Sequence, residues 1–204
     1  MYAPSHFDET RLDRLHALID AHPLGTLVTH GEAGLDADHL PFEIGAATAA
    51  APFGTLRAHV ARANPLWRQA GTNVLVVFQG PSAYVSPSLY AEKPVSGKVV
   101  PTYNYAVVHA HGVLRAIDDP AWLRALLERL TARHEEPRGA PWSLDDAPPG
   151  FIDTLLGAMV GIEIPLQRLQ GKWKLSQNRP RADQVAVAAD CTGLMPWMAA
   201  PVRK

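Results

Sequence analysis

Apolar residues recur along this chain at two spacings, one typical of helices and the other typical of strands. Between residues 8 and 21 they return every three or four positions, which predicts an amphipathic helix with Asp8 as its cap. Residues 118–136 show the same period after two aspartates and a proline, which favour a helix start. Asn64, followed by a proline, predicts a short helix, and residues 151–159 predict another.

Stretches rich in Val, Leu, Phe and Tyr predict strands, because such side chains suit a pleated, half-buried surface. The predicted strands are 24–30, 35–44, 53–61, 72–80, 102–117 and 160–176. The turn Gly-Glu-Ala-Gly at 31–34 joins the first two strands, and a Gly-Pro turn after the fourth precedes a further extended stretch. Gly112 is expected to bend the fifth strand. Because most of them follow one another without an intervening helix, we expect a mainly β fold, an antiparallel barrel or sheet with peripheral helices.

Composition indicates a globular protein. Apolar residues make up 47% and charged residues 19% of the 204 residues, which excludes wholesale disorder. The formal net charge of −1 does not favour direct DNA binding, since nucleic-acid-binding proteins usually carry a basic surplus. Cys191 is the sole cysteine, no apolar run approaches the roughly 20 residues of a membrane helix, and the start does not resemble a signal peptide. We therefore expect a soluble, cytoplasmic protein.

The segment HVARANPLW (59–67) is the strongest candidate for binding an anion. His59 and Arg62 lie where a predicted strand gives way to the helix capped by Asn64. Free N–H groups at a helix start attract anions, and an arginine offers a pair of donors that matches a phosphate. The alternative is a capped helix with an exposed arginine, and spacing alone favours that alternative.

Other candidate chemistry is weaker. The sequence lacks a glycine-rich phosphate loop, which disfavours an NTPase or a Rossmann domain. His109 and His111 share one face of a predicted strand, but two histidines without a carboxylate or thiolate fall short of a metal site. In PTYNY (101–105), Tyr103 lies on an aromatic face and Asn104 on a hydrogen-bonding face, a pattern that suits a flat heterocycle or, equally, aromatic core positions. Catalytic residues stay unassigned, because no serine or cysteine pattern identifies a nucleophile.

The order of motifs along the chain resembles that of the PaiB family, the FMN-binding negative transcriptional regulators. The matching motifs are MYxPxHF (1–7), DADHLPF (36–42), HVARANPLW (59–67), VFQGPSAYVSPSLY (77–90), VPTYNY (100–105), LTARHE (130–135), VGIEI (160–164) and GKWKLSQNRP (171–180). They span nearly all of residues 1–180, and the third and the last are the most specific. Residues 191–204 follow no pattern of this family that we identify.

The resemblance implies an FMN-binding split barrel, an antiparallel six-stranded barrel like that of the pyridoxamine-phosphate oxidases. We expect it to form one domain over residues 1–180, followed by a C-terminal tail over 181–204. The resemblance also implies a homodimer with FMN at its interface. A small-molecule substrate or signal would be a further partner, whereas direct DNA binding and a membrane are not expected.

The same resemblance assigns cofactor-binding residues and no metal ligand. It places the flavin phosphate at Arg62 and His59, with Asn64 nearby, and the isoalloxazine ring beside His39, Tyr103 and Asn104. Lys172 and Lys174 would supply positive charge, and Ser176, Gln177 and Asn178 would supply hydrogen bonds. The alternative for this last segment is that it braces the dimer without touching FMN. Leu89 and Tyr103 stand where the family pattern has tryptophan, so flavin contact is expected to be altered and not abolished.

Three functions stay open on the sequence, and they leave open whether the protein is an enzyme. The first is a PaiB-like negative regulator that acts indirectly, through flavin redox or small-molecule sensing, because no helix-turn-helix pair is evident. The second is an FMN-dependent oxidoreductase of flavin-reductase type, in which the flavin carries the chemistry and no side-chain nucleophile is needed. The third, a haem-binding split barrel, is suggested by His109 and His111.

Overall fold

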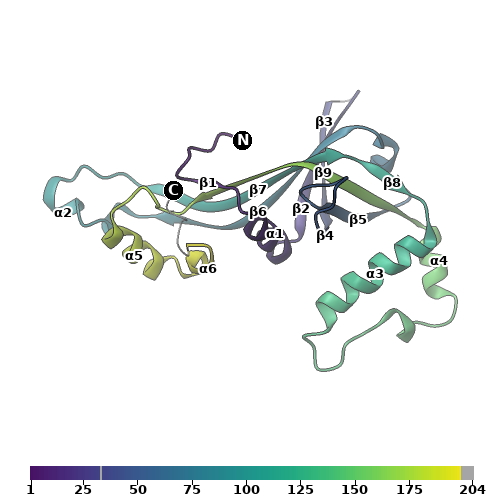
Figure 1. Cartoon of the computed structure of the whole chain (residues 1–204). Helices are drawn as coiled ribbons and strands as arrows, with labels where there is room; N and C mark the ends of the chain where they lie inside the picture. The colour runs from purple at the N-terminus through teal and green to yellow at the C-terminus, as the bar shows by residue number, and fades with distance from the viewer. Residues whose placement is uncertain (33, 199–204) are drawn as a thin grey trace. The chain divides into compact units, whose positions relative to one another are not determined.

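The computed structural model describes residues 1–32 and 34–198. The described chain contains strands (β), α-helices (α) and short 3-10 helices (η) (Figure 1). In order they are β1 (Asp8–Glu9), α1 (Leu12–Ala21), β2 (Leu24–Gly31), β3 (Gly34–Pro41), β4 (Glu43–Gly45), β5 (Thr55–Ala61), η1 (Pro65–Gln69), β6 (Asn73–Val85), η2 (Pro87–Leu89), α2 (Lys93–Ser96), β7 (Thr102–Val113), β8 (Arg115–Ile117), α3 (Pro120–Glu135), η3 (Leu144–Asp146), α4 (Phe151–Gly157), β9 (Met159–Lys174), α5 (Arg181–Asp190), η4 (Thr192–Leu194) and α6 (Met195–Met198).

The fold is mainly antiparallel β, as predicted. In the described part of the chain the strands follow the hydrogen-bonded order β3-β2-β6-β7-β9-β5-β4, and β1 and β8 each pair with β9. β2 pairs antiparallel with β3 and β6, while β9 pairs antiparallel with β1, β5 and β8. The long strand β9 therefore lies inside the sheet, between β7 and β5, and also pairs with the short strands β1 and β8.

The chain divides into two compact units. Unit 1 comprises Met1–His22, Phe78–His109 and the described residues from Gln170 on. Unit 2 comprises Pro23–Val77 and Ala110–Leu169. Strands β6, β7 and β9 contribute residues to both units, so neither unit is formed by one continuous stretch of sequence.

Helix α1 supplies part of the core of unit 1. It buries Leu15, Leu18 and Ile19, the positions that its helical spacing predicts. A Cβ atom at Gly80 of β6 would lie 2.9 Å from Leu18 Cδ1 and 3.2 Å from the carbonyl oxygen of Ala106. The glycine thus allows close approach to α1, and each fully buried leucine stabilises the unit by about 1.5–3 kcal/mol.

Helix α3 supplies the corresponding layer of unit 2. It begins as predicted, with Asp119 accepting a hydrogen bond from the backbone N–H of Ala121 at 2.8 Å, and it buries Leu123 and Leu126. A Cβ atom at Gly161 of β9 would lie 2.4 Å from the ring of Trp122, so this glycine lets α3 pack directly against the strand.

Several predicted boundaries are wrong, among them the strand predicted over 35–44, which is divided at Phe42 into β3 and β4. The first helix begins at Leu12 without a side-chain cap, because Asp8 belongs to β1, where it lies opposite Lys172 of β9. β6 runs unbroken to Val85, because its Gly-Pro pair serves close packing and not a turn. The strand predicted over 102–117 is divided into β7 and β8 after Val113, close to the bend expected at Gly112.

The segment after residue 180 contains structure that its sequence did not indicate. α5 buries Val187, and the buried carboxylate of Asp183 accepts a hydrogen bond from the backbone N–H of Ala91 at 3.0 Å. A domain boundary at residue 180 stays a prediction, and residues 199–204 of the predicted tail lie outside the described residues. Within the described ranges, no helix has both the length and the apolar character to cross a membrane.

Candidate functional site

In unit 1, the start of β7 and the end of β9 bring most of the predicted flavin-binding residues together. Lys174 donates hydrogen bonds from Nζ to the hydroxyl of Thr102 and to the backbone carbonyl of Tyr103. Both acceptors are uncharged, so they hold the ammonium group without neutralising it. Burial lowers the pKa of Lys174, and the neighbouring Lys172 lowers it further, although Tyr105 acts in the opposite direction.

Aromatic rings surround the second lysine of this pair. Lys172 Nζ lies 5.5 Å from the ring centre of Tyr105 and 5.7 Å from that of Tyr2, distances at which a cation interacts favourably with a ring. Tyr103 is 59% exposed and packs edge to face with Tyr84, which is 53% exposed. This arrangement presents exposed aromatic surface beside two lysines, which we call the lysine–tyrosine surface (Lys172, Lys174, Tyr84, Tyr103 and Tyr105).

Asn104 and Ser176 lie beneath this surface and contact each other. Asn104 Nδ2 donates to Ser176 Oγ at 2.8 Å, and the two residues are only 1% and 3% exposed. Ser176 has a φ of 65°, in the left-handed region that a non-glycine residue adopts at a cost. The buried hydrogen bond stabilises this turn, so both side chains fix the end of β9 against β7. Direct contact of either residue with FMN stays a prediction.

The remaining residues of the segment 171–180 serve mainly local structure. Gln177 accepts a hydrogen bond from the backbone N–H of Leu175 at 2.7 Å and donates one to the carbonyl of Trp173. Trp173 is 2% exposed and packs in the core of unit 1, as expected, whereas Asn178 is exposed. The interpretation that this segment braces the structure therefore fits Gln177 and Ser176. Lys172 and Lys174 stay candidates for binding an anion.

In unit 2, Arg62 is surrounded by acceptors of the protein itself. Its guanidinium donates to both carboxylate oxygens of Asp118, at 2.6 and 3.0 Å, and to the carbonyls of Gly157 and Met159, at 2.9 and 3.0 Å. Four of the five N–H groups of Arg62 are thus engaged, and Asp118 balances its charge. The assignment of phosphate to Arg62 stays a prediction, and the geometry gives this residue a structural role.

Asn64 lies close by and is likewise occupied. Its Oδ1 accepts from the backbone N–H of Leu66 at 2.8 Å, which confirms the predicted cap of η1, and its Nδ2 donates to Asp38 at 2.8 Å. His59 is half-buried on β5, and no described residue hydrogen-bonds its buried Nδ1. Burial lowers the pKa of His59. His39 is exposed on β3 opposite Thr26.

Sequence reasoning missed two groups of residues that shape these sites. Asp118 and Asp38, the acidic partners of Arg62 and Asn64, lie 56 and 26 positions away from them in sequence. Tyr84 was not singled out, although it lies in a motif on which the resemblance rests. The sequence signal that could have identified Tyr84 is the alternation of aromatic residues along its own strand and the neighbouring strand.

The histidines that suggested haem occupy successive outward positions of β7. Arg168 Nη2 lies 3.0 Å from Nδ1 of His111, so a cation contacts this ring. Across the described residues, no three His, Cys, Asp or Glu side chains are grouped so that they could hold a metal ion. Haem needs only one or two axial ligands, so the haem alternative stays a prediction.

Comparison with known proteins places the chain in a family. Residues 1–168 match the family described as "Putative FMN-binding domain". An uncharacterized protein of Emericella nidulans is 34% identical over 222 residues, covering 92% of this chain and 88% of that protein. The "Protease synthase and sporulation protein PAI 2" of Bacillus subtilis is 32% identical over 192 residues, covering 92% and 87%.

Solved structures identify the fold. The FAD and heme binding protein of Mycobacterium smegmatis superposes with a TM-score of 0.61 at 17% identity, covering 88% of this chain and 78% of that one. The flavocytochrome Anf3 of Azotobacter vinelandii superposes with a TM-score of 0.57 at 13% identity, covering 82% and 69%. These likenesses show that the chain has the split-barrel fold that was expected. The family match over residues 1–168 and the Bacillus relative show that this chain belongs to the PaiB family of FMN-binding proteins.

Proposed function

We propose that this protein binds FMN through the lysine–tyrosine surface of unit 1 and acts as a PaiB-like regulator. The observation that carries the proposal is the pair Lys172 and Lys174, whose described hydrogen-bond and ring partners are all uncharged. An anionic phosphate would find two cations there; Asp8 of β1 lies opposite Lys172, whereas the hydrogen bonds of Lys174 go to uncharged acceptors. Arg62 and its partner Asp118 in unit 2, which we call the Arg62 corner, attract an anion much less, because the guanidinium is already paired with the carboxylate of Asp118.

The residues present fit a flat, anionic cofactor. The exposed rings of Tyr84 and Tyr103 provide surface for a planar heterocycle, and the lysines provide charge-assisted hydrogen bonds for its phosphate. FMN supplies hydride and electron transfer when bound. The contribution of the chain is to bind the cofactor, to orient it and to stabilise negative charge with Lys172 and Lys174.

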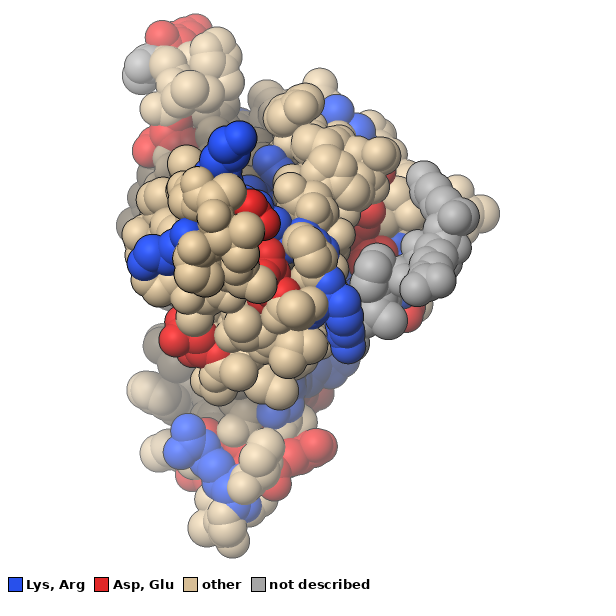
Figure 2. Space-filling view, turned by 90° about the vertical axis from the view of Figure 1, so that its left-hand side faces the viewer, with Lys and Arg blue, Asp and Glu red and all other residues tan. Residues whose placement is uncertain are grey.

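An indirect route to regulation agrees with the distribution of charge. On the face shown in Figure 2, basic and acidic side chains are interspersed, and the formal net charge is −1. A surface that follows a DNA backbone is usually a continuous basic stripe. We infer that the protein affects transcription through the redox state of its flavin or through a small molecule, and not by binding an operator.

We further propose that two copies associate through the exposed apolar residues of unit 1. Tyr84, Val95, Val100 and Tyr103 are each more than half exposed, with Val95 at 79%. Burial of such residues in an interface would remove this apolar surface from water. The lysine–tyrosine surface lies on the same unit, so dimer formation and FMN binding would be linked.

The test is an absorption spectrum of the purified protein, before and after addition of FMN and gel filtration. Flavin bands that elute with a dimer are expected. A protein that elutes without flavin would overturn the proposal, and a band typical of haem would favour the third function instead.

Regulator and enzyme are then distinguished with the FMN-loaded protein. Steady-state oxidation of a nicotinamide cofactor would identify a flavin reductase and contradict a purely regulatory role. A salt-sensitive shift of promoter DNA would contradict the indirect route.

A further inference from the structure

The turn that follows β9 carries a basic residue, Arg179, that the proposed flavin site does not include. Its guanidinium lies over the ring of Tyr90, with the central carbon 4.4 Å from the ring centre. Tyr90 is only 2% exposed, so its ring forms a fixed support for this side chain. An arginine that lies over an aromatic ring keeps the N–H groups along the edge of its guanidinium available to another partner.

Hydrogen bonds fix the backbone of Arg179 from two sides. Its N–H donates to the carbonyl of Ser176 at 2.9 Å, and its carbonyl accepts from Nε2 of Gln184 on α5 at 2.8 Å. Ser176 is the residue with the left-handed φ of 65°, and its hydroxyl accepts from Asn104 beneath the lysine–tyrosine surface. The turn at Ser176 thereby places Arg179 over Tyr90.

Helix α5 also holds the segment that carries Tyr90. Asp183 of α5 is 4% exposed and accepts a hydrogen bond at 3.0 Å from the backbone N–H of Ala91, the residue after Tyr90. The same helix therefore contacts the backbone of Arg179 and the support beneath its guanidinium. A binding group that its own protein has already positioned loses little conformational entropy when a ligand binds.

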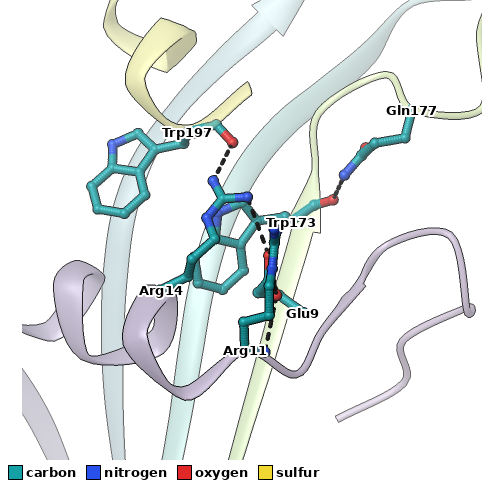
Figure 3. A network of polar contacts seen from close by, with 6 residues as sticks. All are labelled: Glu9, Arg11, Arg14, Trp173, Gln177 and Trp197. Carbon is teal, nitrogen blue, oxygen red and sulfur yellow. Dashed lines mark hydrogen bonds and ion pairs between the residues drawn. The ribbon is translucent and has the colours of Figure 1, made fainter. Parts of the chain in front are cut away.

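Other arginines of unit 1 are already paired. A cleft of about 450 Å³ lies beside Trp173, and its walls come from the two ends of the chain. Its arginines, Arg11 and Arg14, both donate to the carboxylate of Glu9 (Figure 3). Arg179 differs from them, because across the described residues no carboxylate pairs with its guanidinium and no group accepts a hydrogen bond from it.

The charge of Arg179 acts on the lysine–tyrosine surface. Burial lowers the pKa of Lys174, and the charges of Lys172 and Arg179 lower it further, although Tyr105 acts in the opposite direction. Like charges that lie close together repel each other, and an anion bound between them relieves this repulsion. Asp8 lies opposite Lys172 in the sheet, so Lys174 and Arg179 are the pair best placed to attract an anion.

We propose that Arg179 and Lys174 together bind the dianion of a phosphate monoester, and that Arg179 makes the site selective for FMN over riboflavin. A phosphate monoester carries about 1.5 to 2 negative charges at pH 7. A guanidinium can donate two parallel hydrogen bonds to one phosphate, and an ammonium group can add another. Riboflavin has the same ring system without the phosphate, so it gains nothing from either residue. The inference rests on the proposed flavin site only for the identity of the ester.

The first test compares the two flavins. FMN and riboflavin are titrated into the full-length protein and its variants, and flavin fluorescence gives both dissociation constants. Arg179→Gln, which removes the charge, is expected to weaken FMN binding about ten- to hundredfold and to leave riboflavin binding unchanged. Arg179→Lys keeps the charge without the planar pair of donors, so it should weaken FMN binding only about two- to tenfold. Arg181→Gln, the control, removes an exposed charge two positions away and should change neither constant.

The riboflavin constant separates binding from structure. If Arg179 only supports the packing around Tyr90, its loss will weaken both flavins alike, and that outcome would overturn the proposal. An FMN constant that is unchanged in Arg179→Gln, or that rises equally in Arg181→Gln, would overturn it as well. Should Arg179→Gln not fold, Arg179→Lys decides the matter, and an unchanged FMN constant in that variant contradicts the proposal.

A titration with ribose 5-phosphate separates this inference from the flavin proposal. Ribose is the uncharged control, and NMR signals of the arginine Nε–H groups report binding, with the Arg179 signal identified by its absence in Arg179→Lys. Ribose 5-phosphate is expected to shift this signal in a saturable manner, whereas ribose leaves it in place. If the signal shifts but FMN does not bind, the flavin proposal fails and the assignment of Arg179 to phosphate stands. If FMN binds while ribose 5-phosphate leaves the Arg179 signal in place, the flavin proposal stands and this inference fails.

Discussion

The Arg62 corner of unit 2 and the lysine–tyrosine surface of unit 1 both place basic side chains where sequence motifs suggested anion binding, yet they differ in how the charge is balanced. At the corner, a carboxylate and two backbone carbonyls take four of the N–H groups of Arg62. At the surface, Lys174 is held by a hydroxyl and a carbonyl, and Lys172 by aromatic rings. We therefore expect an anion to bind at the basic residues whose hydrogen bonds go to uncharged groups, and not at Arg62, whose charge Asp118 balances.

The comparison also separates positioning from binding within unit 1. Asn104 and Ser176 are buried and bonded to each other, whereas the lysines and Tyr103 face outward. The first pair would determine stability and the geometry of the turn, and the second group would determine affinity. Substitutions can test whether these two roles are distinct.

The largest effect is expected from removing both lysines. Lys172→Met combined with Lys174→Met should weaken FMN binding on the order of a hundredfold, because each charge-assisted hydrogen bond contributes roughly 1.5–3 kcal/mol. Flavin fluorescence quenching measures the dissociation constant. Lys93→Met, which removes an exposed lysine of the same unit, is the control and should leave the constant unchanged. Equal affinity in the double variant and the wild type would eliminate the lysine–tyrosine surface as the flavin site.

A smaller effect, on stability, is expected at the buried pair. Asn104→Ala leaves Ser176 Oγ without its donor in a buried turn, so the free energy of unfolding should fall by about 1–3 kcal/mol in urea. FMN affinity of the folded variant should change less than it does in the lysine variant. If affinity falls and stability does not, Asn104 contacts the flavin directly and the separation of roles is wrong.

The pH dependence of FMN binding should reveal the environment of Lys174. An ordinary lysine has a pKa of about 10.4. Because burial lowers the pKa of Lys174, its positive charge is lost at a lower pH than that of an ordinary lysine. FMN affinity should therefore decline as the pH rises through this lowered value. Lys174→Arg keeps its charge to higher pH and should move the decline upward. Superimposable profiles would show that Lys174 does not carry the interaction.

The smallest effect is expected at His59 in unit 2. Burial lowers the pKa of His59, so the unfolded chain binds a proton at a higher pH than the folded protein does. Stability should fall as the pH drops below the unfolded value of about 6.5 and should level off below the folded one. His59→Gln should remove this pH-dependent part of the free energy of unfolding. The change should be well below the loss of stability expected for Asn104→Ala. An unchanged slope would indicate that other groups cause the acid sensitivity.

Elements with strong periodicity could be predicted from the sequence, and those fixed by distant partners could not. The repeating leucines and the cap at Asp119 gave α3, and Asn64 gave the start of η1. Asp8 is also a good cap residue by type, but its pairing with Lys172 in β1 overrides that local preference. Likewise, a Gly-Pro pair is a common turn signal, yet packing against Leu18 makes Gly80 part of a continuous strand.

The candidate site was predictable in composition but not in its electrostatic balance. Both basic motifs and the alternation of Tyr103 and Asn104 could be read from the sequence, but which of the two is buried could not; the structure buries Asn104 and exposes Tyr103. The neutralising partner Asp118 could not, since its distance in sequence from Arg62 gives no local signal. The cleft beside Trp173 was missed for the same reason, because its walls come from both ends of the chain.

The measurement that tests the central claim most directly is the FMN dissociation constant of Arg62→Met beside that of the wild type. Thermal unfolding with Asp118→Asn as the matched variant separates loss of the ion pair from loss of the fold. Our account predicts unchanged FMN affinity in both variants, with lower stability caused by the lost pairing. A weakening of tenfold or more in folded Arg62→Met, with wild-type affinity in Asp118→Asn, would place the phosphate at Arg62 and contradict the account.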